Sequence, residues 1–319
     1  GVGYIEGGWP GANPKDTEFF RRAASELDLQ RAKLAAFGAT RRSGVAAADD
    51  PLVAALRDSG ASVVTLVAKS HDRHVELALR TTLEENLAMV RDTVAHLTAE
   101  GQTVFLDAEH FFDGYRANRA YALEVLRTAY EAGAEVAALC DTNGGMLPSW
   151  VGDVVGDVVS STGGRVGIHC HNDTGCAVAN SLAAVDAGAT HVQGTINGYG
   201  ERVGNCDLVP IIANLSLKLG VETIPEDRLA RLTSVAHHVA ELDNFVADPQ
   251  QPYVGTKAFA HKAGLHVNAL RKNKKTYEHI NPKLVGNERR FLISELSGRS
   301  NVLAKLGESK IAEDKKLAR

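Results

Sequence analysis

The feature that most constrains this sequence is a regular alternation of short apolar stretches with longer amphipathic ones. The short stretches are apolar nearly throughout, which is typical of parallel strands buried on both faces. They are residues 4–6, 33–37, 63–68, 103–107, 135–140, 165–169 and 191–194. The longer stretches have the period of helices, and several end at a glycine. They are residues 16–27, 51–59, 82–100, 118–132, 148–160, 176–187 and 208–219. This alternation predicts an α/β fold with a parallel sheet.

The number and spacing of the units favour a TIM barrel. A (β/α)8 barrel has eight strand–helix units of about 30 residues each, and seven are found here. A doubly wound sheet also accommodates seven strands, but it gathers its polar residues at one switch point. In this sequence polar clusters follow many different strands, at Glu6, 69–71, 107–109, 141–142, 169–171 and Asn197. We therefore expect a TIM (β/α)8 barrel whose first strand and helix are missing from a chain that continues before Gly1.

The alternation stops near residue 224, which suggests a second region. Residues 226–246 have the pattern of one helix, and residues 249–255 form a linker rich in proline and glutamine. We expect a barrel domain over residues 1–224 and a smaller, mainly helical appended subdomain over residues 225–319.

Composition excludes several classes of protein. Of the 319 residues, 44% are hydrophobic and 23% are charged, which excludes a disordered chain, a fibrous repeat and a small disulfide scaffold. The net charge of −4 gives no general electrostatic basis for binding nucleic acid or an anionic membrane. No apolar run is long enough to span a bilayer. Four cysteines without a CxxC pair indicate free thiols in a reducing cytoplasm.

The strongest candidate site follows the strand at residues 165–169. Because side chains alternate along a strand, His169 and His171 point to one face and Cys170 to the other. Two imidazoles side by side are good ligands for a divalent ion, to which a carboxylate or substrate oxygens could be added. The alternative is a pair of polar histidines at a strand end. We expect Asp173 to cap the helix that follows.

A glycine-rich segment, residues 194–205, follows the next strand. Its four glycines allow close approach of the backbone to a ligand, with Glu201, Arg202 and Asn205 as the polar groups it could aim. A tight surface turn is the alternative. The segment lacks the strand–GxGxxG–helix arrangement of a dinucleotide site.

Three further positions carry candidate chemistry. Glu109, at a strand end, could act as an acid or base or could cap a helix. Thr142 and Asn143 could hold a substrate carboxylate or could start a helix. In the appended region, the basic stretch 269–276 could bind the phosphates of a ligand such as coenzyme A, or could be a solvated charged face.

Taken together, these residues resemble the acetyl-CoA-dependent condensing enzymes of the DRE-TIM metallolyase superfamily, the isopropylmalate, homocitrate and citramalate synthases. The resemblance covers nearly the whole chain. It is closest to the isopropylmalate-synthase-like citramalate branch. The stretches that carry it are GGWPGANPKDTEFF (7–20), LVAKSHDRHVE (66–76), DAEHFFDGY (107–115), CDTNGGMLP (140–148), QPYVGTKAFAHKAGLH (251–266) and TYEHINPKLVGN (276–287).

The resemblance implies roles for particular residues. His169 and His171 would hold Mg, Mn or Zn, with Asn205 as a further or water-mediated ligand. Glu109 and Thr142 would lie in an α-keto acid pocket. In the appended region, His266 of the Gly-x-His pattern would be the catalytic base or its relay, and Tyr277 would reach the site. Because the family supplies this base from the partner subunit, the resemblance also implies a homodimer.

The sequence departs from the family pattern in two places. The Asp-Arg-Glu-like segment of the first barrel strand, which provides a metal-binding carboxylate and an arginine, is not found in these 319 residues, and neither is the C-terminal regulatory domain. We expect a truncated chain, although an inactive binding subunit is an alternative.

The expected reaction joins acetyl-CoA to pyruvate and gives citramalate and free coenzyme A, on a route to isoleucine. One alternative is an isopropylmalate or homocitrate synthase, which acts on a bulkier α-keto acid. Another is a related acyl-CoA lyase or aldolase that uses Cys206 as a reactive thiol.

Overall fold

Residues 2–292 are described by the structure, a computed structural model. The chain divides into two compact units, Gly1–Leu208 and Val209–Arg319. The part of the predicted appended subdomain that follows residue 292 lies outside the described residues.

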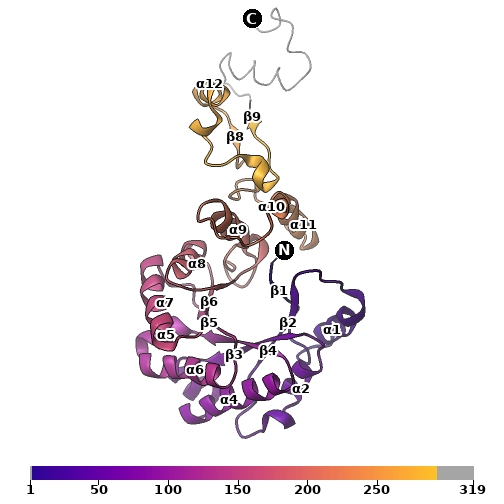
Figure 1. Ribbon diagram of the computed structural model, residues 1–319, viewed down its shortest axis with the longest axis vertical. Coiled ribbons are helices and arrows are strands. Elements are labelled where there is room, and N and C mark those ends of the chain that lie inside the picture. The colour runs from indigo at the N-terminus through magenta and orange to yellow at the C-terminus, as the bar shows by residue number, and fades with distance from the viewer. Residues whose placement is uncertain (1, 293–319) are drawn as a thin grey trace, which may run out of the picture. The chain divides into compact units, whose positions relative to one another are not determined.

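The first unit is built on a seven-stranded parallel sheet (Figure 1). Its strands are β1 (Tyr4–Glu6), β2 (Lys33–Ala39), β3 (Val63–Lys69), β4 (Thr103–Glu109), β5 (Val136–Asp141), β6 (Val166–Cys170) and β7 (His191–Gln193). They follow one another across the sheet in chain order, and the sheet curls between its edge strands β1 and β7. This order is that of a TIM barrel and differs from the rearranged order of a doubly wound sheet. The α/β barrel prediction is confirmed, with seven of the eight strands of a barrel in the described residues.

Helices cover the outer face of this sheet. They are α1 (Pro14–Glu26), α2 (Pro51–Arg57), the short α3 (Asp72–His74) with the π-turn Val75–Leu79, α4 (Leu83–Ala99), α5 (Phe111–Ala117), α6 (Arg119–Glu131), α7 (Pro148–Thr162) and α8 (Ala177–Asp186). Asn13, Thr82 and Asn118 each accept a hydrogen bond from a backbone N–H in the first turn of α1, α4 and α6. Such caps satisfy N–H groups that have no partner within the helix. Helices α4 and α6 begin within one residue of their predicted starts, and α1 begins two residues before its predicted start.

The strand register separates an apolar outer face from a mixed inner face. On the outer face, the side chains of Leu66, Leu106, Leu139 and Ile168 are fully buried. On the inner face, an apolar layer lies near the amino ends of the strands, formed by Ala35, Val63, Phe105 and Val136 with Tyr4 packed against it. Polar side chains follow this layer toward the carboxyl ends of the strands.

The second unit is mainly helical. Its elements are α9 (Leu208–Leu217, which begins at the boundary), α10 (Glu226–Leu229), α11 (Leu232–Leu242), β8 (Ala260–His261), α12 (Gly264–Lys272), β9 (Arg290–Phe291) and the 3-10 turns Lys274–Thr276 and Pro282–Val285. The prediction of one helix over residues 226–246 is wrong, because α10 and α11 are separate and α11 ends at Leu242. Among residues 2–292, no helix is both long and apolar enough for a membrane span.

Candidate metal and substrate site

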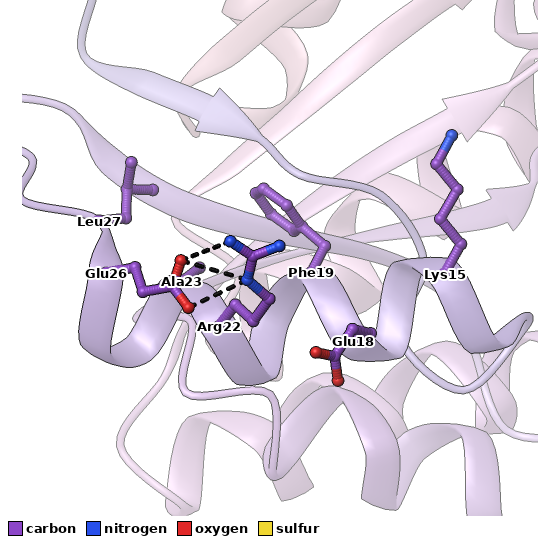
Figure 2. A pocket seen from close by; sticks show the side chains of 7 residues that line it. All are labelled: Lys15, Glu18, Phe19, Arg22, Ala23, Glu26 and Leu27. Atoms are coloured by element: carbon purple, nitrogen blue, oxygen red, sulfur yellow. Dashed lines mark hydrogen bonds and ion pairs between the residues drawn. The ribbon is translucent and has the colours of Figure 1, made fainter.

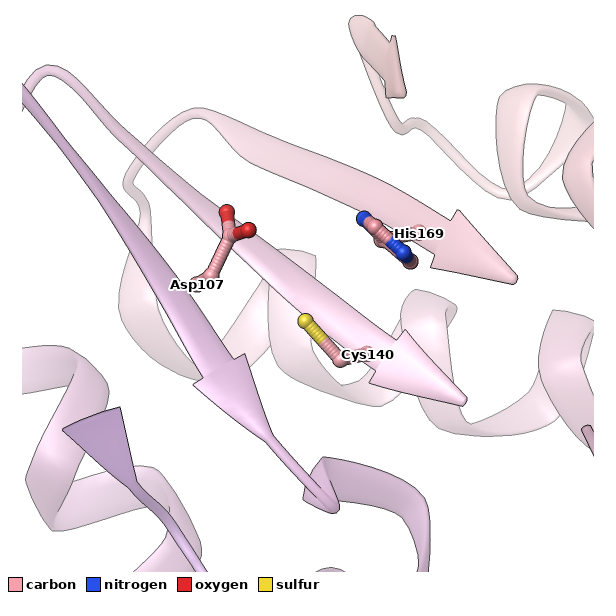
Figure 3. A group of neighbouring side chains, drawn as sticks. All are labelled: Asp107, Cys140 and His169. Carbon is pink, nitrogen blue, oxygen red and sulfur yellow. The ribbon is translucent and has the colours of Figure 1, made fainter. Parts of the chain in front are cut away.

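The inner face of the sheet carries a polar layer above its apolar layer. Asp107 on β4, Cys140 on β5 and His169 on β6 project into the same space, and their potential ligand atoms all lie within 4.8 Å of one another (Figure 3). Cys140 pairs in register with His169, and Asp107 with Ala138 on the strand between them. The parallel register thus brings together side chains from three strands that are far apart in sequence.

A glutamine connects two members of this layer. Gln193 on β7 donates from Nε2 to Oδ1 of Asp107 (2.8 Å), and its Oε1 lies 2.7 Å from Nδ1 of His169. Asp107 is 5% exposed. Burial raises the pKa of its carboxyl group, whereas the charge of His169 and the hydrogen bond from Gln193 lower it. The side chain of Gln193 therefore bridges a buried carboxyl group and a predicted metal ligand.

The two predicted metal ligands lie side by side as the alternation of the strand requires. The ring centroids of His169 and His171 are 5.3 Å apart. Burial, followed by the charges of His169 and Arg202, lowers the pKa of His171 and so favours the neutral imidazole that can bind a metal. Cys170 points to the opposite face and is buried.

Two polar atoms beside these rings have no hydrogen-bond partner in the described part of the chain. They are Nδ1 of His171 and Oδ1 of Asn205, both buried. Their backbones form an isolated antiparallel bridge, so the two residues are neighbours. A buried imidazole nitrogen and amide oxygen without partners are a donor set that a divalent ion satisfies. The residues present here therefore fit a divalent metal.

Glu109 forms an ion pair with Lys69, which is its register partner on β3. Both side chains are about a quarter exposed, at 26% and 24%. The hydroxyl group of Ser70 donates to the Glu109 carbonyl oxygen (2.7 Å) and fixes the backbone at the strand end. Glu109 is thus held by β3 at the carboxyl edge of the sheet, where substrates of TIM barrels bind.

Thr142 and Arg202 connect the loops at the same edge. The hydroxyl oxygen of Thr142 accepts a hydrogen bond from the backbone N–H of His110 (2.8 Å) and keeps its own proton free to donate. The Arg202 guanidinium donates to both carboxylate oxygens of Asp173 and to the Thr142 carbonyl oxygen, each at 2.8 Å. Asn143 donates to Oδ2 of Asp113 (2.8 Å).

Asp173 does not cap the following helix, as the sequence suggested. The side-chain oxygen of Asn172 accepts from the N–H of Ala177 at the start of α8 (3.1 Å), while Asp173 pairs with Arg202. A bidentate arginine–carboxylate pair holds the carboxylate more strongly than a single backbone N–H does.

His266 and Tyr277 lie close together in the second unit. His266 is on α12, and its ring stacks on that of Tyr277 with centroids 4.0 Å apart. Tyr277 is 43% exposed. The next residue, Glu278, is buried and forms ion pairs with Arg289 and, at 3.5 Å, with His261. These pairs anchor the segment that presents Tyr277.

A family model described as HMGL-like matches residues 1–239. The chain belongs to the HMGL-like family. A second model, described as homocitrate synthase post-HMGL domain-like, matches residues 253–318.

Curated relatives of this HMGL-like chain fall in two groups. It is 63% identical to an (R)-citramalate synthase of Streptomyces coelicolor, over 95% of the chain and 57% of the relative. It is 52% identical to an (R)-citramalate synthase of Aquifex aeolicus, over 99% of the chain and 60% of the relative. A homocitrate synthase AksA of Methanopyrus kandleri is 36% identical, over 97% of the chain and 74% of the relative. The chain spans less than two thirds of the length of the citramalate synthases.

Solved structures with the same fold include a Bacillus subtilis HMG-CoA lyase. It matches with a TM-score of 0.64 and 18% identity, over 77% of this chain and 83% of that chain. At this identity the likeness supports the barrel fold alone.

Two residues at the site of this HMGL-like chain were not predicted from the sequence as site residues. Gln193 and Lys69 each contact a predicted site residue. A glutamine within a short strand is itself a signal, because an amide that faces other side chains of a sheet requires polar partners.

A groove of about 470 Å³ lies elsewhere, along α1. Seven residues line it, six of them from this helix and the last just after its end: Lys15, Glu18, Phe19, Arg22, Ala23, Glu26 and Leu27. Figure 2 shows that Arg22 and Glu26 pair with each other along the helix. None of these residues belongs to the polar layer, so the groove is not the candidate site.

Proposed function

We propose that this protein is an (R)-citramalate synthase, which condenses acetyl-CoA with pyruvate in a metal-dependent reaction and releases citramalate and coenzyme A. The observation that carries the proposal is the pair of imidazoles of His169 and His171 beside the unpartnered amide oxygen of Asn205. Relatives called (R)-citramalate synthase, 49–63% identical over nearly the whole chain, support the substrates.

His169 and His171 would hold the divalent ion, and Asn205 would add an oxygen ligand directly or through water. When bound, such an ion acts as a Lewis acid on an α-keto acid, making its keto carbon more electrophilic. The donor set of two imidazoles and an amide oxygen is compatible with Mg, Mn or Zn.

The remaining steps are assigned to side chains of this chain. His266 takes a proton from the methyl group of acetyl-CoA, and the carbon left with the electron pair bonds to the keto carbon of pyruvate. The keto oxygen gains a proton, and water then splits the thioester, leaving citramalate and the free thiol of coenzyme A.

Other side chains orient these groups. Glu109, held by Lys69, supports the base, and Thr142 donates its free hydroxyl proton to the carboxylate of the keto acid. Asn143 and Arg202 complete the substrate pocket, and Tyr277 acts with His266, on which it stacks.

The quaternary structure and the cellular setting belong to the same proposal. We assign a homodimer in which the appended subdomain, residues 225–319, serves the partner's barrel domain, residues 1–224. Four free cysteines suit a reducing cytoplasm, and citramalate places the reaction on a route to isoleucine.

The identity of the product tests the function. Purified protein is incubated with acetyl-CoA, Mn²⁺ and an equimolar mixture of pyruvate, 2-oxoisovalerate and 2-oxoglutarate, and the products are separated by mass. Citramalate as the main product is expected. A predominance of isopropylmalate or homocitrate would move the assignment to those synthases, and no condensation product would favour an inactive binding subunit.

The lyase alternative depends on a reactive thiol at Cys206. That side chain is fully buried, and Ser181 donates a hydrogen bond to its sulfur (3.2 Å). Burial raises the pKa of Cys206 to about 12, which keeps it a neutral thiol rather than a nucleophilic thiolate. This geometry favours the condensing reaction over a cysteine-dependent lyase.

A further inference from the structure

The side chain of Gln193 occupies a position where an apolar residue would cost less. It lies half-buried on the edge strand β7, in register with His169, and both ends of its amide are used. One end contacts the buried carboxyl group of Asp107 and the other contacts Nδ1 of His169. An amide whose two ends each have a specific side-chain partner indicates a role beyond filling space.

The hydrogen bonds among Asp107, Gln193 and His169 determine which ring nitrogen of His169 carries the proton. The NH₂ group of the Gln193 amide donates a hydrogen bond to Oδ1 of Asp107 (2.8 Å), which fixes the orientation of the amide. The amide oxygen then faces His169, and because it only accepts hydrogen bonds, Nδ1 of His169 must carry the N–H. Since a neutral imidazole has one N–H, its Nε2 is left with a lone pair. Free histidine prefers the opposite tautomer, with the proton on Nε2.

We propose that Gln193, anchored by Asp107, is a positioning residue that holds His169 in the Nδ1–H tautomer and in one ring orientation, so that Nε2 can bind a divalent ion. This inference rests on the proposed function, since it presupposes the metal site. Outer contacts that fix the tautomer of a histidine ligand typically change metal affinity by roughly 10- to 100-fold when they are lost.

The tautomer can be read without metal and without activity. Protein with ¹⁵N-labelled histidine is measured by NMR in the metal-free state, and the His169 signals are assigned by their loss in His169→Gln. The wild type is expected to show a protonated Nδ1 and an unprotonated Nε2. A protonated Nε2 in the wild type would overturn the inference.

A set of variants tests the linkage to metal affinity. Gln193→Leu removes the acceptor at similar volume, and its Kd for Mn²⁺, measured by calorimetry, is expected to rise roughly 10- to 100-fold. The double variant Asp107→Asn with Gln193→Glu exchanges the two groups at constant net charge. It again places an acceptor at Nδ1 and a donor at residue 107, so its Kd is expected to return to within about threefold of the wild type.

The control is Gln102→Leu. Gln102 is another partly buried glutamine, which donates to the carbonyl oxygens of Leu56 and Ala61 on the same barrel. Its replacement should leave both the tautomer of His169 and the Kd for Mn²⁺ unchanged.

If the wild type binds Mn²⁺ and Gln193→Leu binds it equally well, the inference fails and the proposed function stands. If the wild type shows the expected tautomer but binds no divalent ion, the proposed function fails and the tautomer assignment stands without its metal role. A double variant that stays as weak as Gln193→Leu would contradict the assigned hydrogen-bond directions.

Discussion

At the scale of single residues, the hydroxyl of Thr142 joins two strand ends. It accepts the N–H of His110, whose φ of 55° is a left-handed conformation that is costly for a residue with a side chain. Thr142→Val leaves that N–H without its acceptor, whereas Thr142→Ser keeps the hydroxyl.

We expect Thr142→Val to lower kcat/KM for the keto acid roughly 5- to 100-fold, and Thr142→Ser to lower it less than about threefold. Steady-state kinetics with pyruvate as the varied substrate measures both. A larger loss in Thr142→Ser than in Thr142→Val would show that the methyl group, and not the hydroxyl, is what the site uses.

His191 makes the stability of the fold depend on pH. It lies on β7 beside the rings of Tyr4 and Phe105, and burial, with the charge of Arg165, lowers its pKa to about 4. The unfolded chain binds this proton near pH 6.5. Stability is therefore complete above about pH 6.5 and falls as the pH drops toward about 4, by up to roughly 3 kcal/mol.

Urea unfolding at about pH 7 and about pH 5 measures this effect. His191→Gln should lose less stability over that interval than the wild type does. An identical loss in the variant would assign the pH dependence to other groups.

The sequence predicted some of the site at this scale. The facing of His169 and His171 follows from strand alternation and is confirmed by the distance of 5.3 Å between their ring centroids. The contact of Gln193 with Asp107 joins residues 86 positions apart and depends on the register of strands between them. Local sequence patterns do not determine that register, so this contact could not be predicted.

At the scale of elements, the loop 194–205 is shaped by close backbone approach. Gly204 has a φ of 98°, and a Cβ there would lie 2.0 Å from the Gly198 carbonyl oxygen. Gly163, which ends α7, also has a positive φ of 65°, but a Cβ there would meet nothing within 4 Å. Substitutions at Gly204 and Gly163 therefore distinguish the cost of steric overlap from the cost of backbone strain.

Gly163→Ala should cost about 1 kcal/mol of unfolding free energy by strain alone. Gly204→Ala should cost more and should also weaken Mn²⁺ binding, because the loop carries Asn205. Urea unfolding and calorimetry on both variants check this. If Gly204→Ala bound Mn²⁺ with wild-type affinity, the conformation of the loop 194–205 would not matter for the metal site.

Strands were easier to predict than the ends of helices. Each of the seven strands lies within two residues of its predicted bounds, because buried parallel strands are continuous apolar runs. At the break between α10 and α11 the backbone of Gly286, far along the chain, approaches so closely that a Cβ there would lie 2.1 Å from the Ala230 carbonyl oxygen. The end of α11 is local, since Asn244 adopts a left-handed φ of 56° just after it.

At the scale of the whole molecule, the proposed catalytic groups lie in two different units of the chain. The proposed metal ligands lie in the first unit and the proposed base, His266, in the second. If the second unit serves a partner subunit, two inactive variants can complement each other.

His171→Ala and His266→Ala are expected to be inactive alone. In a random one-to-one mixture half of the dimers are mixed, and each mixed dimer has one intact site, so about a quarter of the wild-type activity should return. The mixture is assayed after subunit exchange has been confirmed by native mass spectrometry. Exchange without recovery would place His266 in the site of its own chain.

Pyruvate-dependent release of thiol from acetyl-CoA by the purified protein, in the presence of Mn²⁺, tests the proposed metal-dependent condensation directly. The wild type should release thiol, and so should His238→Ala, which removes an exposed histidine on α11. His169→Ala and His171→Ala should each lose roughly 100-fold or more of this activity and bind Mn²⁺ weakly. A wild type that releases no thiol with pyruvate, or a full rate in either histidine variant, would contradict the account.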